Sequence, residues 1–207
     1  MEKAAPIMNS SGLYIALIHH PVVDRNKQLI TSSVTNMDLH DIARSARTFG
    51  VRGYFVVHPS QDEQALNRRI VSHWHSGFGL RSHPTRTRAL ELVHLVHDFE
   101  AVTSHIERET GQRPLKVGTH ARKMGAGIFS IDEMKAEIAK KPVLLVFGTG
   151  YGLAPQWAET LDGFLGPIEG PTDFNHLSVR SAVAIYLDRL MGLRPLTNEG
   201  PLDVIPG

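Results

Sequence analysis

Cysteine is absent from the 207-residue sequence, which excludes disulfide bonds, thiolate zinc sites and cysteine nucleophiles. Long apolar runs are absent too: none approaches the roughly 20 residues that a membrane-spanning helix needs. The N-terminal residues also lack the layout of a signal peptide. Neither sign of charge dominates, with 22 basic and 21 acidic residues, so a nucleic-acid surface would need local clusters of charge. We expect a soluble cytoplasmic protein.

Hydrophobic residues make up 42% of the chain, and the length predicts one domain, residues 1–207, with an irregular C-terminal tail. Strand and helix patterns alternate, which predicts an α/β fold whose mostly parallel sheet carries helices on both faces. Asn36 or Asp38 is expected to cap the first helix, and Ser130 a later one. The predicted strands are 13–23, 51–59, a short strand within 113–122, 141–148 and 163–171; the predicted helices are 35–50, 62–75, 88–111, 131–141, 154–162 and 175–192, with a loop at 76–87.

Ligands of parallel α/β sheets bind beyond the C-terminal ends of the strands, and loops 118–125, 148–153 and 168–174 are the candidates there. The middle loop has glycine at 148, 150 and 152. This string lacks the G-x-G-x-x-G spacing of a dinucleotide site and the Lys-Ser/Thr of a phosphate loop. It is either a tight turn or a ledge where the backbone meets an adenosine without interference from a Cβ.

Three segments resemble the motifs of SPOUT RNA methyltransferases and occur in the same order. In MDLHDIARSARTFGV (37–51), Asp38 and Arg44 stand at the asparagine and arginine positions of the first motif. The segment FGTGYGL (147–153) resembles the second motif, although Gly150 stands where a glutamate is usual. Asn175 with LSVRSAVAIYL (177–187) resembles the third. The resemblance covers roughly residues 12–192, and the layout is most similar to a bacterial subfamily of RNA methyltransferases.

This resemblance implies a deep trefoil knot in the C-terminal part, S-adenosylmethionine as cofactor, and a homodimer whose two subunits complete each active site. The cofactor walls that it implies are Thr119 and His120; Phe147, Gly148, Gly150, Tyr151 and Gly152; and Ile168, Glu169, Gly170, Leu177 and Ser178.

The expected catalytic residues are Arg44, Asp38 and Asp173. A ribose 2′-hydroxyl needs a general base or a charge that stabilises the developing oxyanion, and Arg44 can orient a phosphate or the hydroxyl. A base nitrogen would instead need a carboxylate such as Asp38, Asp173 or Glu169. Two simpler roles stay open: Arg44 as a solvated arginine paired with Asp41, and Asp173 as a turn or cap residue.

Basic and aromatic residues gather between Gln64 and Leu90, where the sequence has no acidic residue. Arginines beside an aromatic ring suit single-stranded or looped RNA, although an ordinary solvated surface would have the same composition. The expected RNA-binding residues are Arg68, Arg69, Trp74, Arg81, Arg86 and Arg88, with a second cluster at Arg122 and Lys123. The 12 histidines predict no metal site, because no three of them have a convincing ligand spacing.

The sequence therefore predicts an S-adenosylmethionine-dependent methyltransferase acting on tRNA or rRNA, with the methylated atom, a ribose oxygen or a base nitrogen, left open. A non-catalytic knotted dimer that binds RNA or the cofactor is the alternative. A nucleotide-dependent oxidoreductase is disfavoured by the missing fingerprint.

Overall fold

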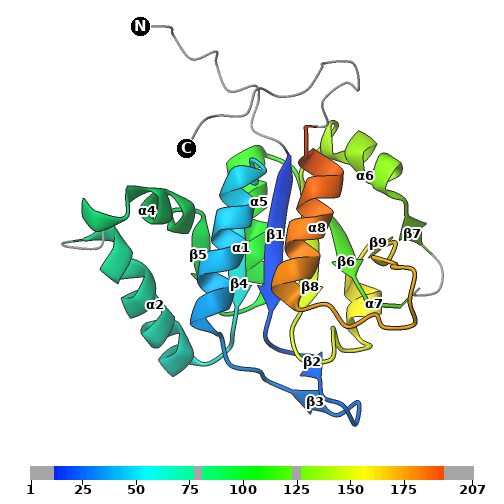
Figure 1. The fold of residues 1–207 in the computed structure, drawn as a ribbon, viewed down its shortest axis with the longest axis horizontal. Coiled ribbons are helices and arrows are strands. Elements are labelled where there is room, and N and C mark those ends of the chain that lie inside the picture. The colour runs from blue at the N-terminus through cyan, green and yellow to red at the C-terminus, as the bar shows by residue number, and fades with distance from the viewer. Residues whose placement is uncertain (1–11, 77–80, 123–126, 194–207) are drawn as a thin grey trace, which may run out of the picture.

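A seven-stranded sheet forms the centre of the protein, whose computed structural model describes residues 12–76, 81–122 and 127–193 (Figure 1). The strand order is β5-β4-β1-β8-β6-β9-β7, and every neighbouring pair in this sheet is parallel. The strands are β1 (Leu13–Ile18), β4 (Tyr54–Val57), β5 (Val93–Val96), β6 (Leu115–Thr119), β7 (Ile128–Phe129), β8 (Val143–Gly148) and β9 (Gly163–Leu165). The parallel sheet predicted from the alternating pattern is confirmed.

Both faces of the sheet are covered by helices, as expected for a parallel sheet. Side chains of β1 alternate between two hydrophobic clusters: Leu13, Ile15 and Leu17 point to one, and Tyr14, Ala16 and Ile18 to the other. The first cluster contains residues of α1 (Asn36–Thr48), α4 (Pro84–Leu90), α6 (Ile131–Ile138) and α8 (Val179–Met191), and α2 (Gln61–His75) packs at its edge. The second contains residues of α5 (Phe99–Thr110) and of α7 (Trp157–Thr160).

The predicted helix 88–111 is wrong, because its middle is strand β5. The segment Val93–Val96 pairs in register with β4 at the edge of the sheet. A new helix then starts after Asp98, whose side chain accepts a hydrogen bond from the Ala101 N–H at 2.8 Å. Val93 and Val96 are β-branched residues that favour strands. Pairing with β4 therefore selects the strand over the helix that the sequence pattern also allowed.

Several predicted boundaries also shift, each for a local reason. Thr35, and not Asn36 or Asp38, caps α1, and Ser130 caps α6 as expected. The predicted loop 76–87 contains the start of α4 at Pro84, a residue favoured in the first helical turn. The last helix starts at Val179, because the Ser178 side chain accepts from the Ser181 N–H.

The predicted strand 13–23 is interrupted at Pro21, which has no N–H to donate to a sheet. The chain then leaves the main sheet and forms an antiparallel hairpin of β2 (Val22–Val23) and β3 (Leu29–Ile30). In Figure 1 this hairpin projects at the lower end of the molecule, where β1 finishes. The sequence pattern did not predict it.

Candidate active site at the strand ends

The three candidate loops follow β6, β8 and β9, which lie side by side in the sheet. Because these strands are parallel, their loops emerge at the same edge. Asn175 on the third loop donates from Nδ2 to the backbone oxygen of Ala121 on the first, at 2.7 Å. A Cβ built on Gly152 of the middle loop would lie 3.6 Å from Nε2 of His120. The structure thus brings together the loops that the sheet argument selected.

Glycine is required at two positions of the middle loop, residues 148–153. A Cβ on Gly148 would lie 2.5 Å from the Leu153 N–H group, because the turn folds back on itself there. Gly150 has a φ of +61°, in the left-handed region that side chains disfavour. At both positions the missing Cβ makes room for the protein itself, the turn at Gly148 and the neighbouring hairpin at Gly150.

The β2–β3 hairpin is joined to this turn by a short backbone ladder. Tyr151 N–H donates to the Val23 oxygen at 2.9 Å, and Val23 N–H donates to the Gly152 oxygen at 3.1 Å. A Cβ on Gly150 would lie only 2.9 Å from the Val23 oxygen. The missing motif glutamate therefore has a physical cause, since the hairpin backbone lies where its side chain would start. The polar run DRNKQ after Pro21 was the sequence signal for a turn here, and sequence reasoning missed it.

His120 on the first loop has its ring oriented by the backbone. Its Nδ1 accepts a hydrogen bond from the Arg122 N–H at 3.0 Å, so the proton of the neutral ring lies on Nε2, the atom facing Gly152. Burial lowers the pKa of His120 below its ordinary value. The ring is therefore a neutral hydrogen-bond donor toward the middle loop at neutral pH.

The other expected wall residues differ in what they can offer. Thr119 is buried and its hydroxyl donates to the Val146 oxygen at 3.1 Å, and the Phe147 ring packs in the core near Tyr186. These two residues present backbone and not side chains. Tyr151 is 64% exposed at the rim. In the third wall, Ile168 packs partly against the core, whereas Glu169, Gly170 and Leu177 are exposed. The Ser178 side chain caps α8.

Asp38 is held in a polar cluster near the start of α1. It is buried, and its two carboxylate oxygens accept from Arg180 Nη1 at 2.8 Å and from the Thr35 hydroxyl at 2.6 Å. A carboxylate engaged on both oxygens is poorly placed to remove a proton from a substrate. Asp173 is exposed in the third loop, and its simpler role as a helix cap is wrong because Ser178 caps α8.

Arg44 lies on the solvent-facing side of α1. The expected pairing with Asp41 is wrong: the Asp41 carboxylate lies 3.6 Å from Nε of Arg180. Arg44 has no ion pair with another residue that the structure describes. The hollow of about 380 Å³ beside it is lined only by Asp41, Arg44, Ser45, Thr48 and Phe49, and by none of the three loops. Among the residues that the structure describes, none from the three loops lines this hollow beside Arg44.

The expected RNA-binding residues fall into separate groups. Arg68 and Arg69 are on α2, Arg81 precedes α4, Arg86 and Arg88 are on α4, and Arg122 is on the first loop; Lys123 lies outside the described residues. The guanidinium of Arg86 lies 4.4 Å from the centre of the Trp74 ring and covers one of its faces. Trp74 also packs against the core. The ring therefore contacts both the core and the Arg86 guanidinium.

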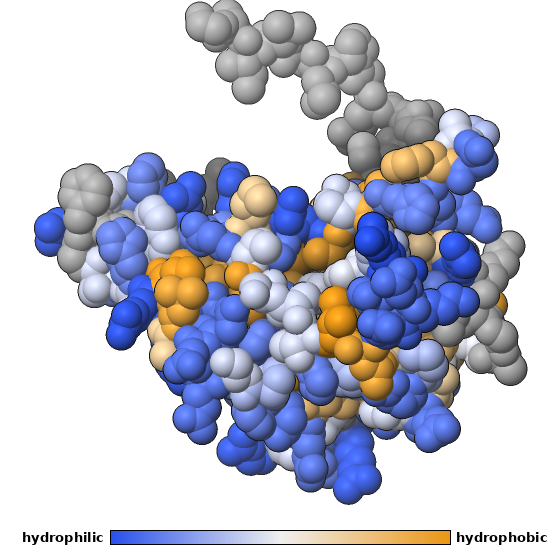
Figure 2. Space-filling view, turned by 90° about the horizontal axis from the view of Figure 1, so that it is seen from below, coloured by the Kyte–Doolittle hydropathy of each residue, from blue (hydrophilic) through white to orange (hydrophobic). Residues whose placement is uncertain are grey.

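The face at the strand ends is seen directly in Figure 2, which looks at the molecule from below Figure 1. It is mostly hydrophilic, with separate hydrophobic patches. Exposed apolar side chains on segments that reach this end are Leu29, Met37, Phe174 and Leu177. Among the residues that the structure describes, no three His, Asp or Glu side chains gather as metal ligands would.

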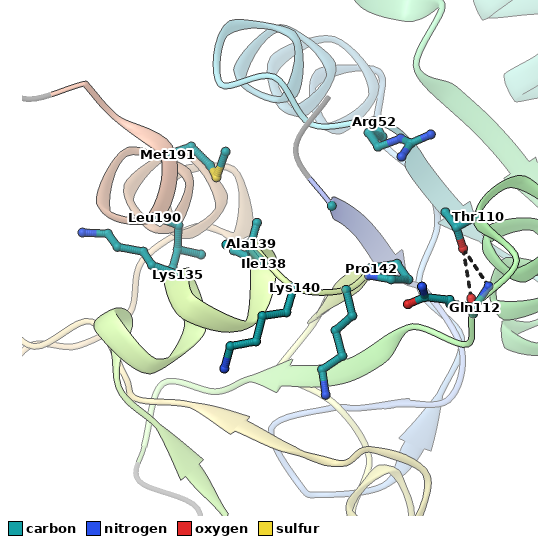
Figure 3. A pocket seen from close by; sticks show the side chains of 12 residues that line it. Arg52, Thr110, Gln112, Lys135, Ile138, Ala139, Lys140, Pro142, Leu190 and Met191 are labelled. Atoms are coloured by element: carbon teal, nitrogen blue, oxygen red, sulfur yellow. Dashed lines mark hydrogen bonds between the residues drawn. The ribbon is translucent and has the colours of Figure 1, made fainter. Parts of the chain in front are cut away.

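A larger hollow, of about 730 Å³, lies at the opposite end of the sheet, where the strands begin (Figure 3). Its cations are already paired: Arg52 with Glu109 at 2.6 Å, and Lys140 with Glu137 at 3.0 Å. Arg52 and Lys140 come from different sides and do not point to a common centre. Because parallel sheets bind ligands at the other end, size alone does not make this hollow the active site.

His19, at the end of β1, connects the middle loop to the hairpin side of the sheet. The ring is fully buried, and its Nδ1 lies 3.1 Å from the Ser32 hydroxyl, which is also hydrogen-bonded to the Thr149 hydroxyl. Its Nε2 has no hydrogen-bond partner among the described residues. Burial, together with the nearby His58, lowers the pKa of His19 to about 4. The folded protein therefore holds this ring neutral.

This burial predicts a specific dependence of stability on pH. Below the ordinary histidine pKa, His19 is protonated in the unfolded chain but not in the folded protein. The free energy of unfolding therefore falls as the pH is lowered from about 6.5 to about 4. Between pH 7 and pH 5 the His19 contribution to the free energy of unfolding should fall by about 2 kcal/mol. Urea unfolding of the wild type and of His19→Asn at both pH values measures it. Other buried histidines lower the stability of both proteins equally, so the His19 contribution is the extra loss in the wild type. An equal loss of unfolding free energy in the two proteins would contradict this assignment.

The architecture defines a class: a doubly covered parallel α/β protein whose ligand loops meet beyond three adjacent strands, the arrangement of enzymes that bind nucleotide-like molecules. The sequence comparison then gives the family. Residues 12–192 match the family described as SAM-dependent RNA methyltransferase, and the chain belongs to it. None of the helices in the described ranges is long and apolar enough to cross a bilayer.

Curated relatives support this membership at substantial identity. Proteins of Oleidesulfovibrio alaskensis and Nitratidesulfovibrio vulgaris, each named tRNA (guanine-N(1)-)-methyltransferase, are 44% and 46% identical over 181 residues. The match spans 87% of this chain but only 42% of each of these relatives. An uncharacterised protein of Aquifex aeolicus is 42% identical over 186 residues, 89% of this chain and 90% of its own length.

Solved structures share the fold at low sequence identity. The SpoU methyltransferase AviRb of Streptomyces viridochromogenes, in complex with the cofactor AdoMet, has a TM-score of 0.54 at 18% identity and covers 87% of this chain and 60% of its own. A TrmH/SpoU tRNA modifying enzyme of Aquifex aeolicus has a TM-score of 0.51 at 15% identity, covering 87% and 74%. At such identities the likeness concerns the fold.

Proposed function

We propose that this protein transfers a methyl group from S-adenosylmethionine to RNA in the cytoplasm, as a single-domain enzyme of the SPOUT type. The single observation that carries the proposal is the meeting of the three loops at adjacent strand ends, with the glycine turn at its centre. Family membership supplies the cofactor and the RNA. We further propose the trefoil knot of that superfamily, supported by the sequence motifs and the neighbouring structures.

The loop residues fit a nucleoside-like cofactor. The tight turn at 148–153 is held in place by the Val23 backbone and lies next to His120, whose Nε2–H is a hydrogen-bond donor at the meeting point of the loops. S-adenosylmethionine would supply an electrophilic methyl group on a sulfonium. The contribution of the chain is then to hold and orient the reactants, which accounts for much of the catalysis of such a transfer.

Of the two α1 residues, Arg44 suits a ribose hydroxyl better than Asp38 suits a base nitrogen as acceptor. Asp38 is engaged on both carboxylate oxygens, so it is a poor general base. Arg44, exposed and without an ion pair in the described structure, can stabilise the developing oxyanion or orient the neighbouring phosphate. Two of the relatives are named for tRNA guanine methylation, but more than half of each lies outside the match. Their name therefore supports tRNA as a substrate without assigning the atom.

A homodimer follows from the same proposal. None of the described residues of the three loops lines the hollow beside Arg44, and a second copy that supplies the loops would complete a site with a catalytic Arg44. The SPOUT resemblance implies such an arrangement.

Two measurements test the function. Calorimetry should show binding of S-adenosylmethionine and none of NAD, and tritium from the labelled methyl group should enter tRNA or rRNA taken from a deletion strain. Digestion of the labelled RNA to nucleosides identifies the acceptor atom. Affinity for NAD alone would overturn the proposal, and cofactor binding without transfer to either RNA would favour the alternative of a non-catalytic RNA- or cofactor-binding dimer.

A further inference from the structure

The β2–β3 hairpin is a firmly anchored projection beside the middle loop. Its first strand is buried at Val22, and the ring nitrogen of Trp157 donates to the Pro21 oxygen at 2.9 Å. The second strand is followed by Ser32, whose N–H donates to the His19 oxygen at 2.9 Å. Together with the ladder to residues 151 and 152, these contacts fix the base of the hairpin, so its tip has a defined position relative to the turn.

The tip of the hairpin presents positive charge to solvent, whereas its one acidic side chain is hydrogen-bonded within the turn. The Asp24 carboxylate accepts from the N–H groups of Asn26 and Gln28 at 2.8 and 2.9 Å, which closes the turn. Arg25 and Lys27 are exposed, and neither forms an ion pair with another residue in the part of the chain that the structure describes. Two free cations on a rigid turn are suited to phosphate groups.

The position of these cations, at the same end of the sheet as Arg122, separates them from the basic residues on α2 and α4. The hairpin projects at the end where the strands finish (Figure 1), and its backbone touches the loop that carries Gly150 and Tyr151. Tyr151, an exposed aromatic ring, lies on that same loop. The hairpin and this loop, joined through their backbones, therefore bring cations and an exposed aromatic ring to the same end of the molecule, and both kinds of group bind single-stranded or looped RNA.

We infer that the β2–β3 hairpin is an RNA-binding element, in which Arg25 and Lys27 hold backbone phosphates next to the methyl-transfer site. This inference rests on the proposed function for the nature of the site, and it adds a surface that the motifs do not include. The hairpin thus has two roles: its backbone supports the 148–153 turn, and its tip positions the RNA.

The double variant Arg25→Gln and Lys27→Gln tests this, because it removes both charges and leaves the anchoring backbone contacts. Binding of bulk tRNA and rRNA, measured by fluorescence anisotropy over a range of salt concentrations, should weaken about tenfold. The slope of log affinity against log salt should fall by about 2, one for each lost phosphate contact. Affinity for S-adenosylmethionine and the urea midpoint should not change. Arg113→Gln with Lys140→Gln, two exposed cations next to the starts of β6 and β8, is the matched control and should bind RNA like the wild type.

The outcomes separate this inference from the proposed function. RNA affinity and salt slope equal to wild type in the double variant would overturn the hairpin inference alone, and so would an equal loss in the control variant. A loss of cofactor affinity in the double variant would also overturn it, since the side chains would then serve the turn. If RNA binding depends on the hairpin while the wild type binds no S-adenosylmethionine, the hairpin inference stands and the proposed function fails.

Discussion

Replacing Gly150 with alanine should weaken S-adenosylmethionine binding at least tenfold and destabilise the protein by about 2 kcal/mol. The new Cβ would lie 2.9 Å from the Val23 oxygen, and the φ of +61° disfavours any side chain. The hairpin and the turn would have to separate, and this would displace the turn that we propose to be part of the cofactor site. Calorimetry for affinity and urea unfolding for stability measure the two effects.

Gly111→Ala is the matched control. Gly111 has a similar φ of +73° at the end of α5, but a Cβ there meets nothing within 4 Å. It should lose about 1 kcal/mol to backbone strain and keep its cofactor affinity. If Gly150→Ala binds the cofactor like Gly111→Ala, then the 148–153 turn is no part of the cofactor site. Gly150→Glu, which recreates the usual motif residue, should be no better than Gly150→Ala, because the hairpin occupies the start of that side chain.

The layered fold could be predicted from the sequence because its signals are local and repeated. The apolar run at 143–148 and the capping residue Ser130 each specify their element without reference to distant parts of the chain. The segment 88–111 could not be read this way. Val93–Val96 is a strand because it pairs with the edge of β4. A helical periodicity fits the whole segment, so the sequence pattern alone did not reveal this strand.

The candidate site was predictable as a set of loops but not as a set of contacts. Parallel strands place their following loops at one edge, so the meeting of residues 120, 152 and 175 follows from the strand assignment. The partners of the charged residues do not follow from it. Asp38 is joined to Arg180, which is 142 residues away in sequence, and Asp41 also turns to Arg180 and not to Arg44.

Gly150, which departs from the motif, shows how the sequence pattern and the packing of the turn are connected. From the sequence alone it is a missing glutamate and an argument against catalysis. In the structure it is the position at which the backbone of the β2–β3 hairpin packs against the turn. Because this packing accounts for the glycine, the missing glutamate is not by itself an argument against catalysis.

Arg44→Ala should lower methyl transfer to RNA by about 100-fold or more, the usual effect of removing a donor that stabilises a developing oxyanion. Affinity for S-adenosylmethionine should stay within about twofold of wild type, because Arg44 lies outside the three loops. Arg47→Ala, on the same helix, is the control: its guanidinium is paired with Glu91 at 2.9 Å on the surface, and such pairs contribute little. Transfer of tritium under single-turnover conditions measures the effect, and a parallel loss of cofactor affinity would place Arg44 in a different site.

Mixing the two variants, assayed at a concentration of S-adenosylmethionine too low to fill the weakened Gly150→Ala site, tests whether Arg44 acts on the loops of a partner subunit. Arg44→Ala retains its loops, and Gly150→Ala retains its arginine, so a mixed dimer contains one complete site if the arginine comes from the other chain. After unfolding and refolding together, half of the dimers are mixed, and activity should return to about a quarter of wild type in a symmetric dimer. An arginine acting within its own chain would give no recovery. Recovery is expected because Arg44 is exposed and the hollow beside it is lined by five residues of Asp41–Phe49 and by no described residue of the three loops.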